Sequence, residues 1–151
     1  MLSEFDKRLL NIVQSDIPLT SRPFAAVAER LESDEATVLA RLQFLRQNGY
    51  IRRIGPFFDS ARLGYVSTLV ALAVEPAAVA AVAAAVNAYP GVTHNYEREA
   101  DYYNLWFALL SPDMAAQEEV LAAVAALSGV KAVLNLPATR KFKVNVRFTL
   151  E

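Results

Sequence analysis

The longest apolar stretch of the chain runs from Val66 to Val86, and a Glu75-Pro76 pair interrupts it. The β-branched residues before the pair favour a strand, and the alanine-rich residues after it favour a helix with Pro76 in its first turn. The stretch is long enough to cross a membrane, but the charged break and the change in composition argue against a span. We therefore expect a strand followed by a helix, and no membrane segment.

The same alternation of strand and helix patterns continues to the end of the chain. Strands are expected near residues 65–74, 92–98, 102–110 and 130–136, with helices near 76–88 and from Pro112 to Leu127. The second and third strands are only a few residues apart, so they should form a hairpin. The order β-α-β-β-α-β is typical of a ferredoxin-like domain. Past Pro137, apolar and basic residues alternate, which predicts one further strand with a basic face.

The first sixty residues predict three short helices and a β-hairpin wing. Apolar residues recur at helical spacing over Phe5–Val13, Pro23 opens a second helix, and Ser33 can cap a third that ends at Asn48-Gly49. Residues 50–58 then predict a wing strand and turn. We therefore expect an α+β protein of two domains: a winged helix-turn-helix over residues 1–60, and a ferredoxin-like domain with an extra C-terminal strand over 61–151.

The composition restricts the chemistry that the chain can carry. With 54% hydrophobic and 21% charged residues, the chain can bury a normal core. It has no cysteine, which excludes disulfides and thiolate metal sites, and its single histidine argues against a protein-built zinc site. Nothing at the N-terminus resembles a signal peptide, so we expect a cytoplasmic location.

The charge of the first half argues against DNA binding. Residues 1–60 carry eight basic and eight acidic side chains, and the expected recognition helix, residues 34–48, has two arginines against two acidic residues. Binding to duplex DNA requires several phosphates to be neutralised by Lys and Arg. A helix-turn-helix with no net charge is therefore expected not to bind DNA.

The single histidine lies in the segment Val92–Arg98. If this segment is a strand, His94, Tyr96 and Arg98 share one face, because side chains alternate along a strand. An imidazole can carry a proton or bind a metal, and a guanidinium grips carboxylates, so the trio suits an anionic or metal-bearing ligand. A half-buried pair of histidine and tyrosine with a purely structural role fits the spacing equally well. Alternation does not fix which side of the sheet the trio faces, although its polarity favours the wetter side.

The expected sheet has two helices on one side and needs cover on the other. Large rings, Trp106 among them, are expected on that far side. We therefore expect a dimer in which two sheets face each other around a cavity.

The whole pattern resembles two related groups of proteins. A helix-turn-helix followed by β-α-β-β-α-β resembles the feast/famine transcription regulators of the AsnC/Lrp-like fold over nearly the entire chain. More specifically, the segments His94–Arg98, Tyr103–Phe107 and Leu134–Lys143 resemble the corresponding segments of the siroheme decarboxylases. The segments Arg52–Gly55 and Phe58–Thr68 are similar to the same family, so the resemblance extends from the wing to the end.

The decarboxylase resemblance implies a definite reaction. It is the loss of carbon dioxide from the C12 and C18 acetate side chains of siroheme, giving 12,18-didecarboxysiroheme for haem or haem d synthesis. The family implies a homologous partner subunit, commonly in a heterodimer with the pocket between the subunits. No cofactor is required beyond the substrate, and haem or the product tetrapyrrole can stay bound. The resemblance to regulators implies instead a DNA-binding protein with a small-molecule effector, and a haem-binding sensor without turnover is a third possibility.

Siroheme is a flat apolar macrocycle with carboxylates on its rim, so its site needs aromatic walls and cations at the edge. We assign His94 as proton donor or as axial ligand of the substrate iron, Tyr96 as its neighbour or substitute, and Arg98 as the cation that orients the acetate. Of the adjacent Trp106 and Phe107, one is expected in the core. The basic residues after the fourth strand can equally be a solvated edge. The proposed substrate-binding residues are Arg53, Tyr103, Trp106, Arg140, Lys141 and Lys143.

Overall fold

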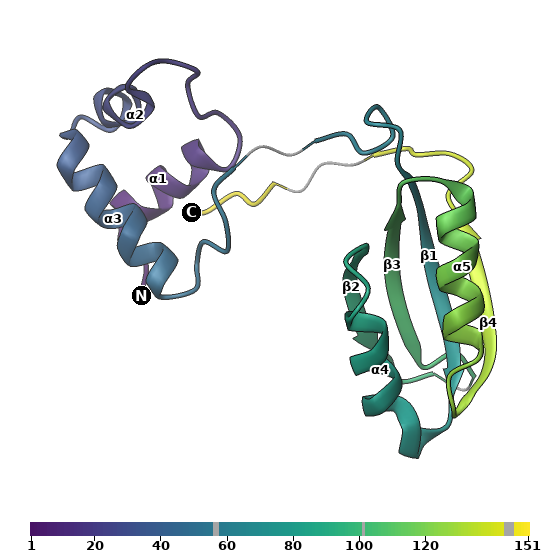
Figure 1. The fold of residues 1–151 in the computed structure, drawn as a ribbon. Coiled ribbons are helices and arrows are strands. Elements are labelled where there is room, and N and C mark those ends of the chain that lie inside the picture. The colour runs from purple at the N-terminus through teal and green to yellow at the C-terminus, as the bar shows by residue number, and fades with distance from the viewer. Residues whose placement is uncertain (56–57, 101, 144–146) are drawn as a thin grey trace. The chain divides into compact units, whose positions relative to one another are not determined.

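The computed structural model describes residues 1–55, 58–100, 102–143 and 147–151, and it divides into two compact units. The first unit comprises residues 1–56 and 143–151, and the second comprises residues 57–142 (Figure 1). The last nine residues therefore belong with the N-terminal unit, whereas the sequence pattern assigned them to the C-terminal domain.

Three helices make up the body of the first unit. They are α1 (Glu4–Val13), α2 (Pro23–Arg30) and α3 (Glu35–Gln47), as predicted from the apolar spacing. The N-cap of α3 is Asp34 and not the predicted Ser33, because the Asp34 carboxylate accepts the Thr37 N–H at 2.8 Å. An aspartate at this position satisfies a helix donor that would otherwise have no partner. The buried side chains between the helices are Leu9, Val27, Ala28, Leu31, Val38, Leu42, Leu45 and Ile51.

A partly buried ion pair joins α1 to α3. The Asp6 side chain is fully buried, and both of its oxygens accept hydrogen bonds from the Arg41 guanidinium at 2.8 Å. Asp6 also accepts the backbone N–H and the hydroxyl of Ser3, at 3.0 and 2.7 Å, in a capping box at the start of α1. The hydrogen bonds from Arg41 lower the pKa of Asp6 to about 2. The guanidinium also lies 4.3 Å from the centre of the Phe44 ring.

The predicted wing strand is not formed in the part of residues 50–58 that the structure describes. The backbone N–H groups of Tyr50 and Ile51 both donate to the carbonyl of Leu45, at 2.9 and 3.2 Å, so they close the end of α3. Gly49, with φ of 76°, allows this turn. Residues 56–57, at the turn of the expected wing, lie outside the described residues. The described part of the first unit is therefore a helix-turn-helix without a wing strand.

The extra C-terminal strand is also absent from residues 138–143 and 147–151, and its expected centre, residues 144–146, lies outside the described residues. Instead, the amide side chains of α1 bind the end of the chain. Phe148 exchanges two hydrogen bonds with the Gln14 amide, at 2.9 and 2.7 Å, and Leu150 does the same with the Asn11 amide, at 3.1 and 2.9 Å. These four bonds, here called the amide clamp, replace the partner strand that an extended segment normally needs.

The second unit has the predicted β-α-β-β-α-β order. A four-stranded antiparallel sheet has the strand order β2-β3-β1-β4, with both helices on one face (Figure 1). The second and third strands form the expected hairpin. The elements are β1 (Val66–Val74), the 3-10 turn η1 (Pro76–Ala78), α4 (Val79–Asn87), β2 (Val92–Glu97), β3 (Leu105–Ser111), α5 (Met114–Ala125) and β4 (Val130–Pro137).

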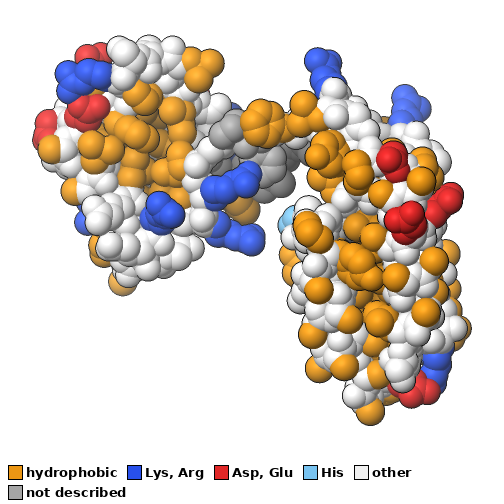
Figure 2. Space-filling model, viewed as in Figure 1, with side chains coloured by type: hydrophobic (Ala, Val, Ile, Leu, Met, Phe, Trp, Pro, Cys, Tyr) orange, Lys and Arg blue, Asp and Glu red, His pale blue; other side chains and the backbone are white. Residues whose placement is uncertain are grey.

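The core of this unit lies between the sheet and the two helices. Phe107 is 1% exposed and belongs to this core, which confirms that one of the two adjacent rings is structural. Figure 2 shows hydrophobic side chains over much of the visible surface of this unit, in keeping with its alanine-rich helices. None of the helices that the structure describes is long and apolar enough to cross a membrane. The other core residues are Val70, Leu72, Val74, Val79, Val82, Val86, Leu105, Leu109 and Val124.

The Asp6–Arg41 pair predicts a loss of stability in acid. Because the pKa of Asp6 is about 2 in the folded protein and 3.8 without its partners, ionised Asp6 stabilises the fold above about pH 4. This contribution, about 2 kcal/mol, is lost as the pH falls from about 4 to 2. Urea unfolding at a series of pH values measures it, and Asp6→Asn should flatten this part of the profile. Asp16→Asn, which removes an exposed pair with Arg30, is the control and should leave the profile nearly unchanged.

Candidate functional site

No helix or strand that the structure describes in the second unit covers the face of the sheet opposite α4 and α5, and this face carries side chains from all four strands. The registers pair β2 with β3, β3 with β1 and β1 with β4, so residues at the same level line up in rows across the sheet. The polar members of these rows lie at the β2 edge, and the rest are apolar. One row contains His94, Ala108, Leu69 and Leu136, and the next contains Tyr96, Trp106, Ala71 and Leu134.

A β-bulge at Thr93 determines which way His94 points. Val92 pairs with Leu109 and packs against the core, yet His94 pairs with Ala108, so Thr93 is an extra residue in the ladder. If Thr93 were a regularly paired strand residue, alternation from Val92 would direct His94 toward the helices. The bulge reverses the alternation, and His94 and Tyr96 face the open side, as their polarity predicted. Their ring centres are 6.1 Å apart.

The Thr93 hydroxyl also contacts the imidazole directly. Thr93 Oγ1 lies 3.0 Å from His94 Nδ1, which leaves Nε2 available to a ligand. Both side chains are exposed. Sequence reasoning placed Thr93 on the opposite face and missed this contact, because period-two alternation contains no signal for a bulge.

Arg98 joins the same face just beyond the end of β2. Its guanidinium carbon lies 5.6 Å from the centre of the Trp106 ring, a cation-π contact that places a positive charge over the aromatic surface. Trp106 in turn donates its indole N–H to the carbonyl of Tyr103 at 2.8 Å. The structure thus brings together His94, Tyr96, Arg98 and Trp106, with Tyr103 in the adjoining turn. The Tyr103 ring packs edge-on against Tyr102, with ring centres 4.8 Å apart.

The remaining predicted residues lie elsewhere. Arg140 and Lys141 follow β4, which is the sheet edge opposite β2, and both are exposed. The Arg140 guanidinium is 4.9 Å from the centre of the Phe142 ring. Arg53 and Lys143 belong to the first unit, and both are exposed. The second unit by itself therefore does not bring the whole predicted basic rim together with His94.

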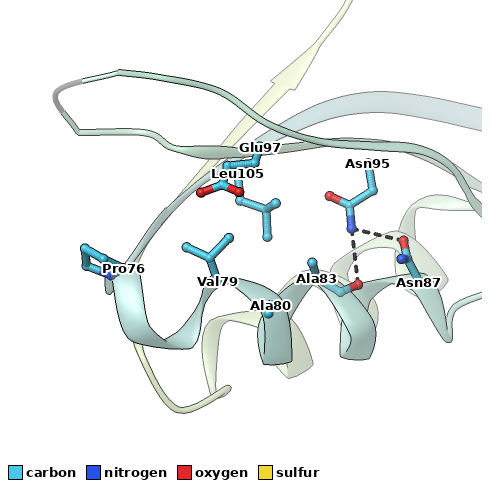
Figure 3. A pocket seen from close by; sticks show the side chains of 8 residues that line it. All are labelled: Pro76, Val79, Ala80, Ala83, Asn87, Asn95, Glu97 and Leu105. Carbon is cyan, nitrogen blue, oxygen red and sulfur yellow. Dashed lines mark hydrogen bonds between the residues drawn. The ribbon is translucent and has the colours of Figure 1, made fainter.

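The helix side of β2 has a separate open depression of ≈ 300 Å³, between this strand and α4 (Figure 3). Asn95 and Glu97 line it, as expected for residues alternating with His94 and Tyr96. The Asn95 amide donates to the Ala83 carbonyl at 3.2 Å and to the Asn87 side chain at 3.0 Å, which ties β2 to α4 (Figure 3). The other lining residues are Pro76, Val79, Ala80 and Leu105.

The donor set of the open face suits an anionic, flat ligand better than a bare metal ion. Within the described residues, no three His, Asp or Glu side chains are grouped to hold a metal. The face instead offers one imidazole, one phenol and one guanidinium beside an apolar floor. Leu69 and Leu136 remain 42% and 38% exposed on this floor. An arrangement of this kind can hold a planar apolar ring and bind a carboxylate at its rim.

The fold places the chain in the AsnC-like class, and comparisons with known proteins define the family. Residues 62–143 match the model of the AsnC-like ligand binding domain, and residues 6–52 match that of the siroheme decarboxylase NirDL-like HTH domain. The E. coli AsnC structure has a TM-score of 0.82 over 97% of each chain, at 15% identity, which is a likeness of fold alone.

Full-length relatives agree with the second family model. The chain is 45% identical to the siroheme decarboxylase alpha subunit of Desulfovibrio desulfuricans, over 99% of this chain and 86% of the relative. It is 46% identical to the siroheme decarboxylase NirDL subunit of Paracoccus denitrificans, over 99% of this chain and 45% of that longer protein. A crystal structure of the siroheme decarboxylase NirDL in complex with an iron-uroporphyrin III analogue matches with a TM-score of 0.72 and 40% identity, over 97% of this chain and 48% of that one. The chain belongs to the siroheme decarboxylase family.

The contact between Thr93 and His94 predicts a measurable effect on the imidazole. Thr93→Val keeps the shape of the side chain but removes the hydroxyl, so the balance between the two neutral tautomers of His94 should change. Because the chain has one histidine, nitrogen NMR of the imidazole reports this change without overlap. Thr93→Ser retains the hydroxyl and should preserve the wild-type signals. Identical spectra for all three proteins would show that the contact does not hold the ring.

Proposed function

We propose that this chain is one subunit of a siroheme decarboxylase that removes carbon dioxide from the C12 and C18 acetates of siroheme. The observation that carries the proposal is the gathering of His94, Tyr96, Arg98 and Trp106 at one edge of a flat, apolar sheet face. A relative with a bound iron-uroporphyrin III analogue supports a tetrapyrrole as the ligand. The macrocycle would lie against the apolar rows, with an acetate at the polar edge.

Each decarboxylation breaks the bond between the carboxylate carbon and the methylene carbon. Carbon dioxide leaves, the electron pair passes into the macrocycle, and a proton added to the methylene carbon completes a methyl group. The protein therefore has two tasks for each acetate, to hold the carboxylate and to supply one proton. No separate cofactor is needed in this scheme.

Three side chains can divide these tasks. The Arg98 guanidinium offers paired donors to the acetate and is directed by its contact with Trp106. His94 supplies the proton through Nε2, since Nδ1 is engaged with Thr93. The Tyr96 hydroxyl belongs to the neighbouring row and is the second proton source on this face. The same Nε2 is the atom that would bind the substrate iron, so proton donation and iron ligation are competing roles of one nitrogen.

A partner subunit is part of the proposal. One chain provides a single wall, whereas a planar ligand held in water requires cover on both sides. A homologous subunit whose sheet faces this one would supply the second wall and further cations for the carboxylate rim. The open face is suited to such pairing, because it is apolar across β3, β1 and β4 and carries few charges.

Removing the proposed proton donors should slow turnover strongly while leaving the fold intact. With the partner subunit and siroheme under anaerobic conditions, the unmodified protein should yield a product that lacks two carboxyl groups by mass spectrometry. His94→Ala combined with Tyr96→Phe should lower the rate by about 10²- to 10⁴-fold, the usual contribution of a positioned acid.

Tyr102→Phe is the matched control, because Tyr102 is as exposed as Tyr96, at 57% and 54%, but lies in the turn after β2. It should leave the rate unchanged. An unaltered rate in the double variant would rule out the assigned roles. A changed visible spectrum of the bound iron tetrapyrrole in His94→Ala, with turnover retained, would assign His94 to the iron.

A DNA-binding regulator is the second candidate, and the likeness of fold to E. coli AsnC favours it. The charges of α3 oppose it. Arg41 is engaged with the buried Asp6, and the first turn of α3 carries the acidic Glu35, which pairs with Arg22. On the face that Figure 2 shows, acidic and basic side chains of the first unit lie among apolar ones.

Gel-shift assays should therefore detect no complex between this protein and genomic DNA fragments, even at about 50 mM salt, where phosphate contacts are strongest. A DNA-binding regulator would form a complex with DNA through phosphate contacts, and the affinity of that complex would fall steeply as salt is added. A salt-sensitive complex selective for one fragment would favour the regulator instead.

A further inference from the structure

Asn104 lies one residue before the start of β3, and its side chain continues the hydrogen bonding of the sheet there. Its Oδ1 accepts the backbone N–H of Val74 at 2.9 Å, and its Nδ2 donates to the Val74 carbonyl at 2.9 Å. Its own backbone N–H donates to the Leu72 carbonyl at 3.0 Å. The amide thus imitates a strand residue opposite Val74, at the point where the β2–β3 turn leaves the sheet.

Arg98 and Trp106 both form hydrogen bonds with the backbone at Tyr103 and Asn104. The Asn104 carbonyl accepts the backbone N–H of Arg98 at 2.8 Å, and the carbonyl of the preceding Tyr103 accepts the Trp106 indole N–H at 2.8 Å. Between Arg98 and Asn104 the chain forms a turn, and the residues that the structure describes within it make no other hydrogen bond to β1. The amide of Asn104 is therefore the anchor that fixes this turn relative to the central strand.

We propose that Asn104 is a positioning residue of the active site, which holds the Arg98 guanidinium over Trp106 and so directs it at the substrate acetate. This inference rests on the proposed function only in the role given to Arg98. The placement of Arg98 and Trp106 by Asn104 is a property of the chain alone.

The chemistry of the anchor is specific to an amide. Val74 is 5% exposed, so its N–H and C=O both need partners within the protein. The asparagine side chain has one acceptor oxygen and one donor nitrogen, which match the N–H and C=O of Val74. The aspartate side chain has the same shape but no donor. In Asn104→Asp, a carboxylate oxygen would face the Val74 carbonyl oxygen, and the turn should move away from β1.

The chain offers a matched control in Asn95. Its amide donates two hydrogen bonds, to the oxygens of Ala83 and Asn87, and it lies in the same hairpin on the helix side. Asn95→Asp therefore introduces the same charge into the same hairpin and also removes the amide donor, while the contacts of Arg98 and Trp106 are left unchanged. Asn104→Ala, which removes the amide without adding a charge, serves as the second variant if Asn104→Asp fails to fold.

The first measurement needs no substrate. Trp106 is the single tryptophan, so its fluorescence reports this site alone. Asn104→Asp should shift its emission to longer wavelength and raise its quenching by acrylamide, and Asn95→Asp should change neither. Equal responses of the two variants would overturn the proposal, because they would reveal a general loosening of the hairpin. This measurement stands even if the protein proves not to decarboxylate siroheme.

The second measurement is a double-mutant cycle on turnover by the complex with its partner. Asn104→Asp alone should lower kcat by about 10- to 100-fold, the effect of a misplaced orienting group, with a smaller change in KM. In an Arg98→Ala background it should lower kcat no further, because its effect passes through Arg98. If the fold-losses in kcat of the two single variants multiplied in the double variant, the proposal would be contradicted. A complete absence of turnover in the unmodified complex would instead remove the proposed function and leave the fluorescence result intact.

Discussion

Two helices cover one face of a four-stranded sheet and leave the other face bare, and the functional features of the second unit depend on this asymmetry. The covered face takes the large aliphatic residues and Phe107, which stabilise the unit by burial. The bare face is consequently free to carry residues that a core would not tolerate, including an imidazole and a guanidinium. The small side chains of Ala71 and Ala73 lie on the central strand of this face, and both are buried.

Much of this arrangement could be predicted from the sequence, because hydrophobic period and helix-breaking residues are local signals. The order of strands and helices, the hairpin and the core position of one ring beside Trp106 all followed from such patterns. The wing and the last strand did not. In both segments the alternation was genuine, but the backbone groups found partners other than a strand, at Leu45 for one and at Asn11 and Gln14 for the other. The direction of His94 depended on a single inserted residue, Thr93, whose effect only the pairing register reveals.

The chain shares its fold with E. coli AsnC, and its third helix directs one of its two arginines to a partner inside the helical unit. In this chain an arginine of the third helix is turned inward to a fully buried aspartate, where it joins helices. The aspartate is fully buried and the arginine side chain stays 35% exposed, so the pair ties one cation of the third helix to the packing of the helical unit.

The amide clamp has a consequence for the connectivity of the protein. The chain leaves the first unit near residue 56 and returns to it at residue 143, so two covalent connections join the units. The second connection ends in residues held to α1 by four hydrogen bonds. A break in the first connection would leave the helical unit attached through this non-covalent hold on its own C-terminus. The side-chain amides of Asn11 and Gln14 thus give the helical unit a second, non-covalent connection to the rest of the chain.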